Sequence, residues 1–143
     1  MALGDRVKTW LGLKPLPVHL QRGVTGERAA KRQLLQQGLK FLTANFRSKR
    51  GEIDLIFRDA DCLVFVEVKT RSSEDWTRPA AAVDRDKRLS LSHAALDYLR
   101  LLRNPRVKFR FDIVEVLLSD DKVSEIRHLP RAFSLSKPLR YDC

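Results

Sequence analysis

The sequence has 143 residues, of which 43% are hydrophobic, and a formal net charge of +10 at pH 7. This hydrophobic content excludes a disordered chain, and the length favours one domain that can bury a core. The chain lacks the apolar run of roughly 18 residues that a transmembrane helix needs. Its two cysteines have no metal-site spacing, so we expect free thiols and a cytoplasmic protein.

The positive charge is concentrated near the N-terminus. Residues 1–50 contain eleven Lys and Arg but only two acidic residues, whereas residues 51–143 contain seventeen Lys and Arg against sixteen acidic residues. Such a basic excess predicts a polyanionic partner, and nucleic acid is favoured among these. The alternative is a solvated basic face that keeps the protein soluble.

The first elements are an arm, a helix and a strand. Residues 1–21 are expected to form an N-terminal arm, because glycine and prolines interrupt its weak apolar periodicity. Thr25 is a good N-cap for a helix over Glu27–Gln37, and a strand is expected over Leu39–Asn45. The basic segment Phe46–Gly51 then connects to the next element.

Residues 51–71 predict a β-hairpin. Apolar and polar residues alternate on both sides of a turn at Asp59–Cys62, and valines occupy every second position from Val64 to Val68. Alternation with a period of two, rich in β-branched residues, is typical of strands. If the turn has four residues, Arg58 pairs with Leu63, which fixes the register of the two strands.

This register places two acidic side chains opposite each other. Asp54 would face Glu67, and Glu52 would face Lys69, all on one face of the hairpin. Opposed Cβ atoms lie about 5 Å apart, so the two acids repel and fold stability does not explain them. A divalent cation would, because Mg²⁺ takes carboxylate oxygens and keeps waters for a phosphate substrate. Lys69 would then orient or deprotonate the attacking water, or neutralise phosphate charge.

A loop and a long helix follow the hairpin. Trp76 lies in a polar stretch, where it could stack on a base or pack on its own domain. Helical spacing extends over Ala80–Leu102, with a break near Val83–Asp84 and a cap from Asp84 or Asp86. Lys87 falls in the first turn, where the helix dipole disfavours a cation, so an external anion is a reasonable partner. An ordinary solvated lysine is the alternative.

The last third predicts two more strands, over Arg106–Leu118 and Val123–Leu129. Asp112 and Arg110 share a face of the first of these strands and are expected to form a structural ion pair rather than a metal site. The predicted fold is α/β, with a mixed, mostly antiparallel central sheet of about five strands flanked by helices, in the order α-β-β-β-α-β-β. Residues 22–135 would form the domain and residues 136–143 a C-terminal tail.

An aspartate followed thirteen residues later by Glu-x-Lys, as in Asp54, Glu67 and Lys69, resembles the PD-(D/E)XK nuclease superfamily. A larger ordered set of segments resembles the YraN-like family of small bacterial proteins, which is described as endonuclease-like, over roughly residues 22–135. The segments are Gly26-Glu27, Gly51–Ile56, Val64–Lys69, Arg110–Asp112 and Ala132-Phe133.

The resemblance implies a restriction-endonuclease-like core and a metal-dependent nuclease. Asp54 and Glu67 would ligate Mg²⁺ or Mn²⁺, with the Val68 carbonyl as a further ligand. Glu27 would reach toward the metal from the first helix, although an acid in that first turn also suits the helix dipole. Lys87 would lie near the active centre. Related folds include Holliday-junction resolvases, so branched DNA is a candidate substrate by analogy.

Further roles rest on charge. Glu52 would either hold Lys69 in place or join the acidic cluster. Arg47, Lys49, Arg50 and Arg71 are candidates to bind phosphates, with an exposed solvated loop as the alternative for the first three. Three other functions stay open: nucleic-acid binding without turnover, RNA cleavage, and binding of a basic protein to the acidic hairpin. The chain could act as a monomer or as a homodimer.

Overall fold

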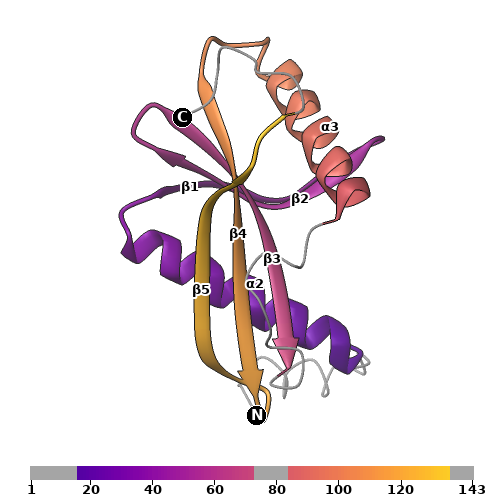
Figure 1. Ribbon diagram of the computed structural model, residues 1–143, viewed down its shortest axis with the longest axis vertical. Helices are drawn as coiled ribbons and strands as arrows, with labels where there is room; N and C mark the ends of the chain where they lie inside the picture. Colours follow the sequence, from indigo (N-terminus) through magenta and orange to yellow (C-terminus); the bar gives the residue numbers. More distant parts are fainter. Residues whose placement is uncertain (1–15, 73–83, 136–143) are drawn as a thin grey trace, which may run out of the picture.

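The computed structural model describes residues 16–72 and 84–135. Within these ranges the order of elements is the predicted α-β-β-β-α-β-β. The helices are α2 (Val18–Gln36) and α3 (Arg85–Leu101), and the strands are β1 (Lys40–Ser48), β2 (Gly51–Asp59), β3 (Cys62–Ser72), β4 (Lys108–Ser119) and β5 (Lys122–Phe133). The strands form one sheet in the order β1-β2-β3-β4-β5 (Figure 1).

The sheet is mixed and mostly antiparallel, as the alternation patterns predicted. Only the β3–β4 pair is parallel among the described strands, because α3 carries the chain back between them. The register of the central hairpin is also confirmed, since Arg58 pairs with Leu63 and Asp59 with Cys62. A five-stranded α/β sheet with helices is therefore consistent with a restriction-endonuclease-like core.

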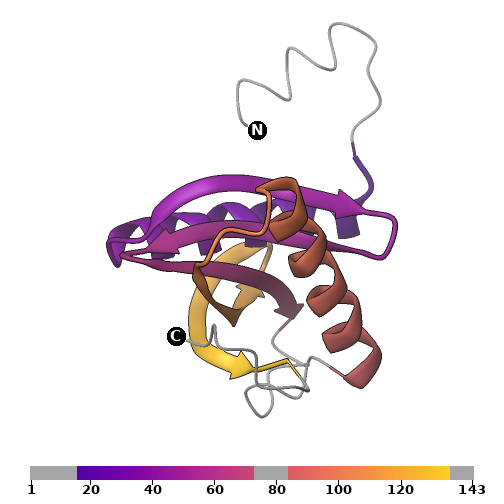
Figure 2. The same cartoon turned by 90° about the horizontal axis from the view of Figure 1, so that it is seen from above.

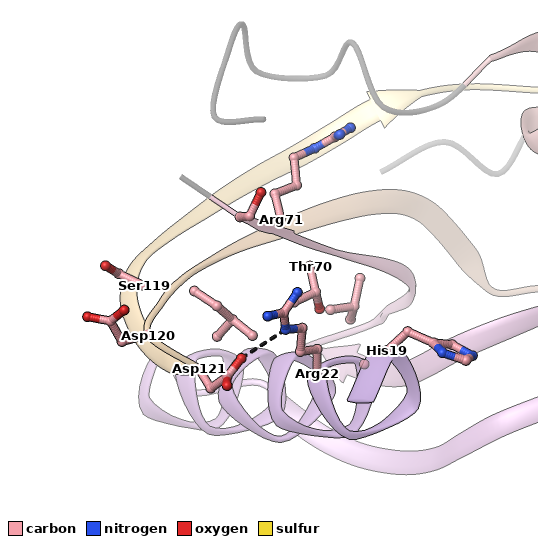
Figure 3. A pocket seen from close by; sticks show the side chains of 11 residues that line it. His19, Arg22, Thr70, Arg71, Ser119, Asp120 and Asp121 are labelled. Atoms are coloured by element: carbon pink, nitrogen blue, oxygen red, sulfur yellow. Dashed lines mark hydrogen bonds and ion pairs between the residues drawn. The ribbon is translucent and has the colours of Figure 1, made fainter. Parts of the chain in front are cut away.

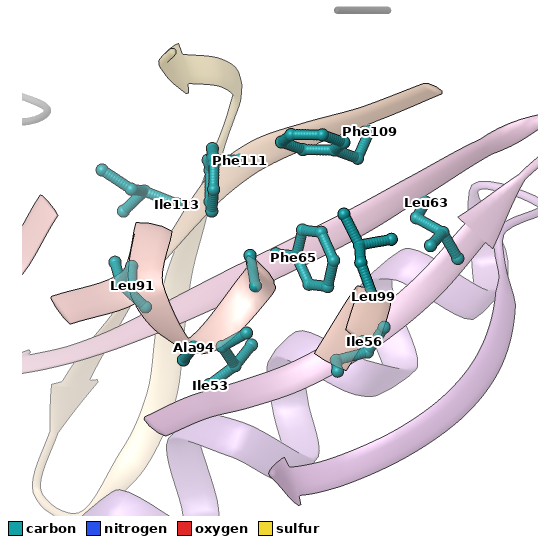
Figure 4. Packing of buried hydrophobic residues seen from close by; sticks show 11 residues of the cluster. Ile53, Ile56, Leu63, Phe65, Leu91, Ala94, Leu99, Phe109, Phe111 and Ile113 are labelled. Carbon is teal, nitrogen blue, oxygen red and sulfur yellow. The ribbon is translucent and has the colours of Figure 1, made fainter. Parts of the chain in front are cut away.

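Each helix covers its own hydrophobic cluster, and the two clusters take alternate residues of the strands. Under α3, Leu91 and Ala94 pack with a cluster centred on Phe65 and Phe111 (Figure 4). Under α2, Ala30 and Leu34 pack against residues of β2, β3 and β4 that point the other way: Leu55, Phe57, Val64, Val66, Val114, Val116 and Leu118. The helices thus lie against opposite faces, which is why β3 and β4 are apolar on both sides.

The β1–β2 pair changes face near its middle. Ile53 packs in the α3 cluster and Leu55 in the α2 cluster, although residues two apart in a regular strand share a face. Between them lies Asp54, and Asn45, which the register of β1 and β2 places opposite it, has a positive φ of 53°. This left-handed residue kinks the pair, which forms a long curved ribbon beside α3 (Figure 2). Asp54 therefore stands at a bend in the sheet.

Helix α2 begins earlier, and strand β1 ends later, than the sequence predicted. Helix α2 begins at Val18, inside the segment predicted as an arm, and Thr25 does not cap it but donates a hydrogen bond to the Gln21 carbonyl at 2.9 Å. Gly26 suits this helix because a Cβ there would overlap the Thr70 hydroxyl on β3. Strand β1 continues to Ser48, so the predicted basic connection is reduced to a turn.

Some expectations fall outside the described ranges, namely those on residues 1–15, on residues 73–83, which include Trp76, and on residues 136–143. Neither of the helices in the described ranges is long and apolar enough to cross a membrane. The prediction of a free thiol is wrong for Cys62, which takes part in a disulfide bond; Cys143 lies outside the described residues.

Candidate functional site

Asp54 lies where β2 and β3 separate. The ladder between these strands ends at Leu55 and Val66, so the next amide on β3 that points toward β2 has no main-chain acceptor there. Asp54 provides one, since its Oδ2 accepts a hydrogen bond from the Val68 N–H at 2.8 Å. The sequence placed Asp54 directly opposite Glu67 in a continued ladder. The ladder stops short of that pair, and the Asp54 carboxylate instead caps the free edge of β3.

Glu67 is the most constrained acidic residue near this edge. Its side chain is buried, with only 4% of the residue exposed. Its Oε1 lies 3.4 Å from the Lys69 ammonium and 3.3 Å from the Lys87 ammonium. Its Oε2 is also buried and is a side-chain oxygen without a hydrogen-bond partner among the described residues. One carboxylate oxygen is thus saturated by two lysines while the other has none.

Lys87 reaches this carboxylate from the other layer of the molecule. It lies in the first turn of α3. The N-cap of this helix is Asp84, one of the two residues predicted to cap it. The Asp84 Oδ1 accepts a hydrogen bond from the Lys87 amide at 2.9 Å, which fixes the start of the helix and therefore the position from which the lysine extends. A cation is disfavoured at the start of a helix, and the ion pair with Glu67 explains in part why Lys87 lies there.

The charge state of Glu67 reflects these opposing neighbours. Burial, and then the negative charge of Asp54, raise its pKa from an ordinary value of 4.5 to about 7, while Lys87 and Lys69 act in the opposite direction. Its pKa therefore lies near neutral pH, where small changes in surroundings decide whether the carboxylate is ionised. Perturbed groups of this kind cluster at functional sites.

The residues present fit a divalent cation in one specific way. A buried polar atom without a partner costs about 1–3 kcal/mol, and a cation beside the Glu67 Oε2 would remove that cost. No three His, Cys, Asp or Glu side chains within the described ranges converge into a ready-made metal cage. An ion would instead take Asp54 and Glu67 together with water or substrate oxygens. This is the usual arrangement for Mg²⁺, which binds through one or two carboxylates.

Two further acids extend the cluster on the side of α2. Burial, followed by the charges of Asp54 and then Glu52, raises the pKa of Glu27, so these three acids lie within electrostatic reach of one another. Glu52 does not pair with Lys69 as predicted, because the β2–β3 ladder ends before them. It faces Arg47 on β1 instead, and their charged groups lie 3.5 Å apart.

Most of the predicted phosphate-binding residues have partners within the protein. Besides Arg47, Arg50 holds Asp97 on α3 with two hydrogen bonds, of 2.6 Å from Nη2 and 3.2 Å from Nε. The bond from Arg50 is the main reason that the pKa of Asp97 is lowered to about 2. Arg71 lies 3.7 Å from the Glu115 carboxylate. Only Lys49, of the four predicted residues, has no ion pair among the described residues.

Glu115 is the residue near the site that sequence reasoning missed. It lies on β4 opposite Lys69 and is 2% exposed, beside the cationic side of the site. Its position could have been suspected from the sequence, since it is the one charged residue in the apolar run from Ile113 to Leu118. A charged residue in such a run is buried among apolar neighbours and needs a cationic partner.

Asp112 belongs to a separate network at the other end of α2. The predicted ion pair with Arg110 is confirmed at 3.1 Å. The structure adds His128 of β5, whose Nε2 lies 2.7 Å from the Asp112 Oδ2 and whose Nδ1 lies 2.9 Å from the Gln37 Oε1. The Arg131 amide also donates to Asp112, at 3.1 Å. Because both carboxylate oxygens of Asp112 are bonded, this network ties β4 and β5 to the C-cap of α2 and is structural.

A cleft of about 680 Å³ opens on the α2 side of the sheet, behind Val68 and Thr70 (Figure 3). The start of α2 and the β4–β5 turn form its other walls, and Arg22 bridges them through an ion pair of 2.8 Å with Asp121. The cleft mixes cationic and anionic side chains, so its lining does not select for one sign of charge.

Comparison with known proteins gives a consistent result. The model of a family described as "Uncharacterised protein family UPF0102" matches residues 26–116. A UPF0102 protein of Trichlorobacter lovleyi is 40% identical over 115 residues, which cover 80% of this chain and 91% of that protein. UPF0102 proteins of Chlorobaculum tepidum and Coxiella burnetii are 41% and 42% identical, over 78% and 74% of this chain and 90% and 88% of theirs.

Proposed function

The chain belongs to the uncharacterised protein family UPF0102, the YraN family that its motifs resemble, and for this member we propose metal-dependent hydrolysis of phosphodiester bonds in nucleic acid, with DNA as the favoured substrate. The buried Oε2 of Glu67, which has no partner in the described part of the chain, carries the proposal. Fold stability does not explain this oxygen, whereas a metal ligand must keep one free.

Asp54 and Glu67 would hold Mg²⁺ or Mn²⁺. The Val68 carbonyl would be a third donor, and Glu27 would be a further ligand. The ion would polarise a phosphoryl oxygen and lower the pKa of a bound water. The Val68 amide fixes the orientation of the Asp54 carboxylate, so this donor needs little rearrangement. A carboxylate that is held in place in this way binds a metal ion with less loss of conformational freedom than a flexible carboxylate on the surface.

The two lysines would manage charge and protons around the scissile phosphate. The Lys69 and Lys87 ammonium groups converge on one oxygen of Glu67, so both lie within a few ångströms of the reacting region. Lys69 would position the attacking water or compensate charge that develops on the phosphate. Lys87 would supply a second positive charge from α3 and hold the Glu67 carboxylate in place.

The test is a cleavage assay with linear, flapped and four-way DNA and with RNA of matched sequence, in Mg²⁺, Mn²⁺ or EDTA. Glu67→Gln preserves the shape of the side chain and should abolish cleavage while leaving most of the binding. Asp61→Asn is the matched control, because it removes one carboxylate from the exposed turn at the far end of the same hairpin. Equal cleavage by Glu67→Gln and wild type would refute the assignment, and cleavage of RNA alone would change the substrate.

One observation favours a second candidate, nucleic-acid binding without turnover. The Glu67 Oε1 is already neutralised by two ammonium groups, so the site holds a counter-charge of its own. Under this alternative the protein binds the same DNA panel equally well in EDTA and in Mg²⁺ and leaves every substrate intact.

A further inference from the structure

Helix α2 presents a row of cations on its outer side. Arg28 and Arg32 are exposed and Lys31 is half-buried, and in the described part of the chain none of the three has an ion pair with a carboxylate. Lys31 lies over the ring of Phe41, 3.7 Å from its centroid, which holds its ammonium in place without neutralising it. We call these three residues the α2 ridge.

The α2 ridge does not help the helix to form. Arg28 and Arg32 are four residues apart, and Arg28 and Lys31 three apart, so their side chains are neighbours on the helix surface. Like charges at these spacings destabilise a helix by about 0.2–0.5 kcal/mol per pair. Glu27 is the only acidic residue of Val18–Gln36, and it is half-buried on the side of the acidic cluster. Neither Arg28 nor Arg32 forms an ion pair among the described residues, so no such contact offsets the repulsion between these two arginines.

The position of the ridge relates it to the candidate site. It begins at the residue after Glu27, which lies within electrostatic reach of Asp54 and Glu52. Arg28 and Arg32 are separated by about 6 Å along the helix axis. The helix itself crosses the strands of the sheet, with its outer side away from them (Figure 1). The ridge is thus a cationic strip on the exposed side of α2 that begins next to Glu27, the residue of this helix that lies within electrostatic reach of Asp54.

The arginines of the α2 ridge differ from those near the turn between β1 and β2 in having no carboxylate partner among the described residues. Arg47 and Arg50 lie in or next to that turn and were predicted to bind phosphates, yet both are held by carboxylates of the protein. A cation that is already paired must break that contact before it binds a phosphate. Arg28 and Arg32 have no such contact to lose, and arginine binds phosphate oxygens with two parallel hydrogen bonds.

We propose that the α2 ridge binds the phosphate backbone of the nucleic acid that enters the site. This inference rests on the proposed function, since it takes nucleic acid as the partner, but it assigns the contact surface to the helix rather than to the β1–β2 turn. Because the contacts are to phosphates, binding through the ridge is independent of base sequence and decreases steeply with salt.

The test measures binding of a labelled 20-base-pair duplex by fluorescence anisotropy in EDTA, from about 50 to 200 mM salt. The variant is Arg28→Gln/Arg32→Gln. The matched control is Arg103→Gln/Arg106→Gln, which removes the same charge from two exposed arginines without ion pairs among the described residues, beyond the end of α3 that is remote from Lys87. Melting curves establish that both variants fold, and the ridge variant should melt no lower than wild type.

We expect the slope of log K against log salt to fall by about 1.8 in the ridge variant, which is about 0.9 for each lost phosphate contact, and to change little in the control. Equal slopes in wild type and the ridge variant, or equal decreases of the slope in the two variants, would refute phosphate binding by the α2 ridge. Neither result would contradict the proposed function. Absence of duplex binding by the wild type itself would instead count against the proposed function.

Discussion

The pH dependence of stability is the sharpest consequence of the Glu67 environment. The pKa of Glu67 is raised from 4.5 to about 7 in the folded protein, so between these values the folded state binds a proton that the unfolded state releases. Stability must therefore decrease as the pH rises through this window and level off above it. The difference between a pKa of 4.5 and one of about 7 corresponds to roughly 3 kcal/mol in the free energy of unfolding.

The perturbation is Glu67→Gln, which is neutral at every pH. Urea unfolding at pH 5, 6, 7 and 8 in EDTA gives the free energy of unfolding of both proteins. The difference between the two curves isolates this one group, because other titrating residues, including Glu27, contribute to both. We expect wild type to lose about 2.5 kcal/mol relative to Glu67→Gln between pH 5 and pH 8, because the unfolded-state carboxyl is already largely ionised at pH 5. Parallel curves would refute the reasoning, since they would mean that Glu67 is not destabilised by burial.

Metal binding gives the complementary measurement on the same pair of proteins. At pH 8 the Glu67 carboxylate is ionised and strained, so a cation that occupies the site should stabilise wild type by mass action. The gain would be about 2.7 kcal/mol when free Mg²⁺ is a hundredfold above its dissociation constant. Glu67→Gln should gain much less. An equal gain in both proteins would place the ion elsewhere on the molecule.

Variants at three other residues test separate roles. Lys69→Met should lower the single-turnover rate by roughly 10²-fold while the affinity for duplex DNA changes little, and an affinity loss of the same size would make it a binding residue. Asp54→Ala leaves the Val68 amide unpaired and should lower the free energy of unfolding by about 1–3 kcal/mol, whereas Asp54→Asn keeps an acceptor and should cost less; equal costs would contradict the capping role. Asp112→Ala should cost about 3–5 kcal/mol, because it removes a buried partner of Arg110, and should leave the salt dependence of DNA binding unchanged.

Local pattern was a good guide where neighbours in sequence are also neighbours in space. The hairpin over residues 51–71 has the predicted register at its turn, since alternation and turn length together leave one pairing that keeps the apolar faces aligned. The same pattern failed a few residues farther along. The kink beside Asn45 and the end of the ladder at Leu55 replace the predicted facing pair of acids with a side-chain cap on β3.

Partners from distant segments could not be read in this way. Arg50 looked like a free cation in a basic loop, but α3 places Asp97 against it. For Lys87 an external anion or solvent was expected, and the fold supplies Glu67. In both cases the sequence gives the charge of a residue but not which charge of the opposite sign will be packed beside it.

The sequence by itself therefore determined the order of elements, the sheet class, the central register and the motif residues Asp54, Glu67 and Lys69. These depend on periodicity and turn chemistry, which act over a few residues. Only the tertiary structure decided that Glu67 is buried with one oxygen that has no partner among the described residues, that Lys87 converges on it, and that Arg47 and Arg50 are paired within the protein whereas Arg28 and Arg32 of α2 are not. Those features depend on how the two helices pack against opposite faces of a kinked sheet, and packing joins residues that no local pattern connects.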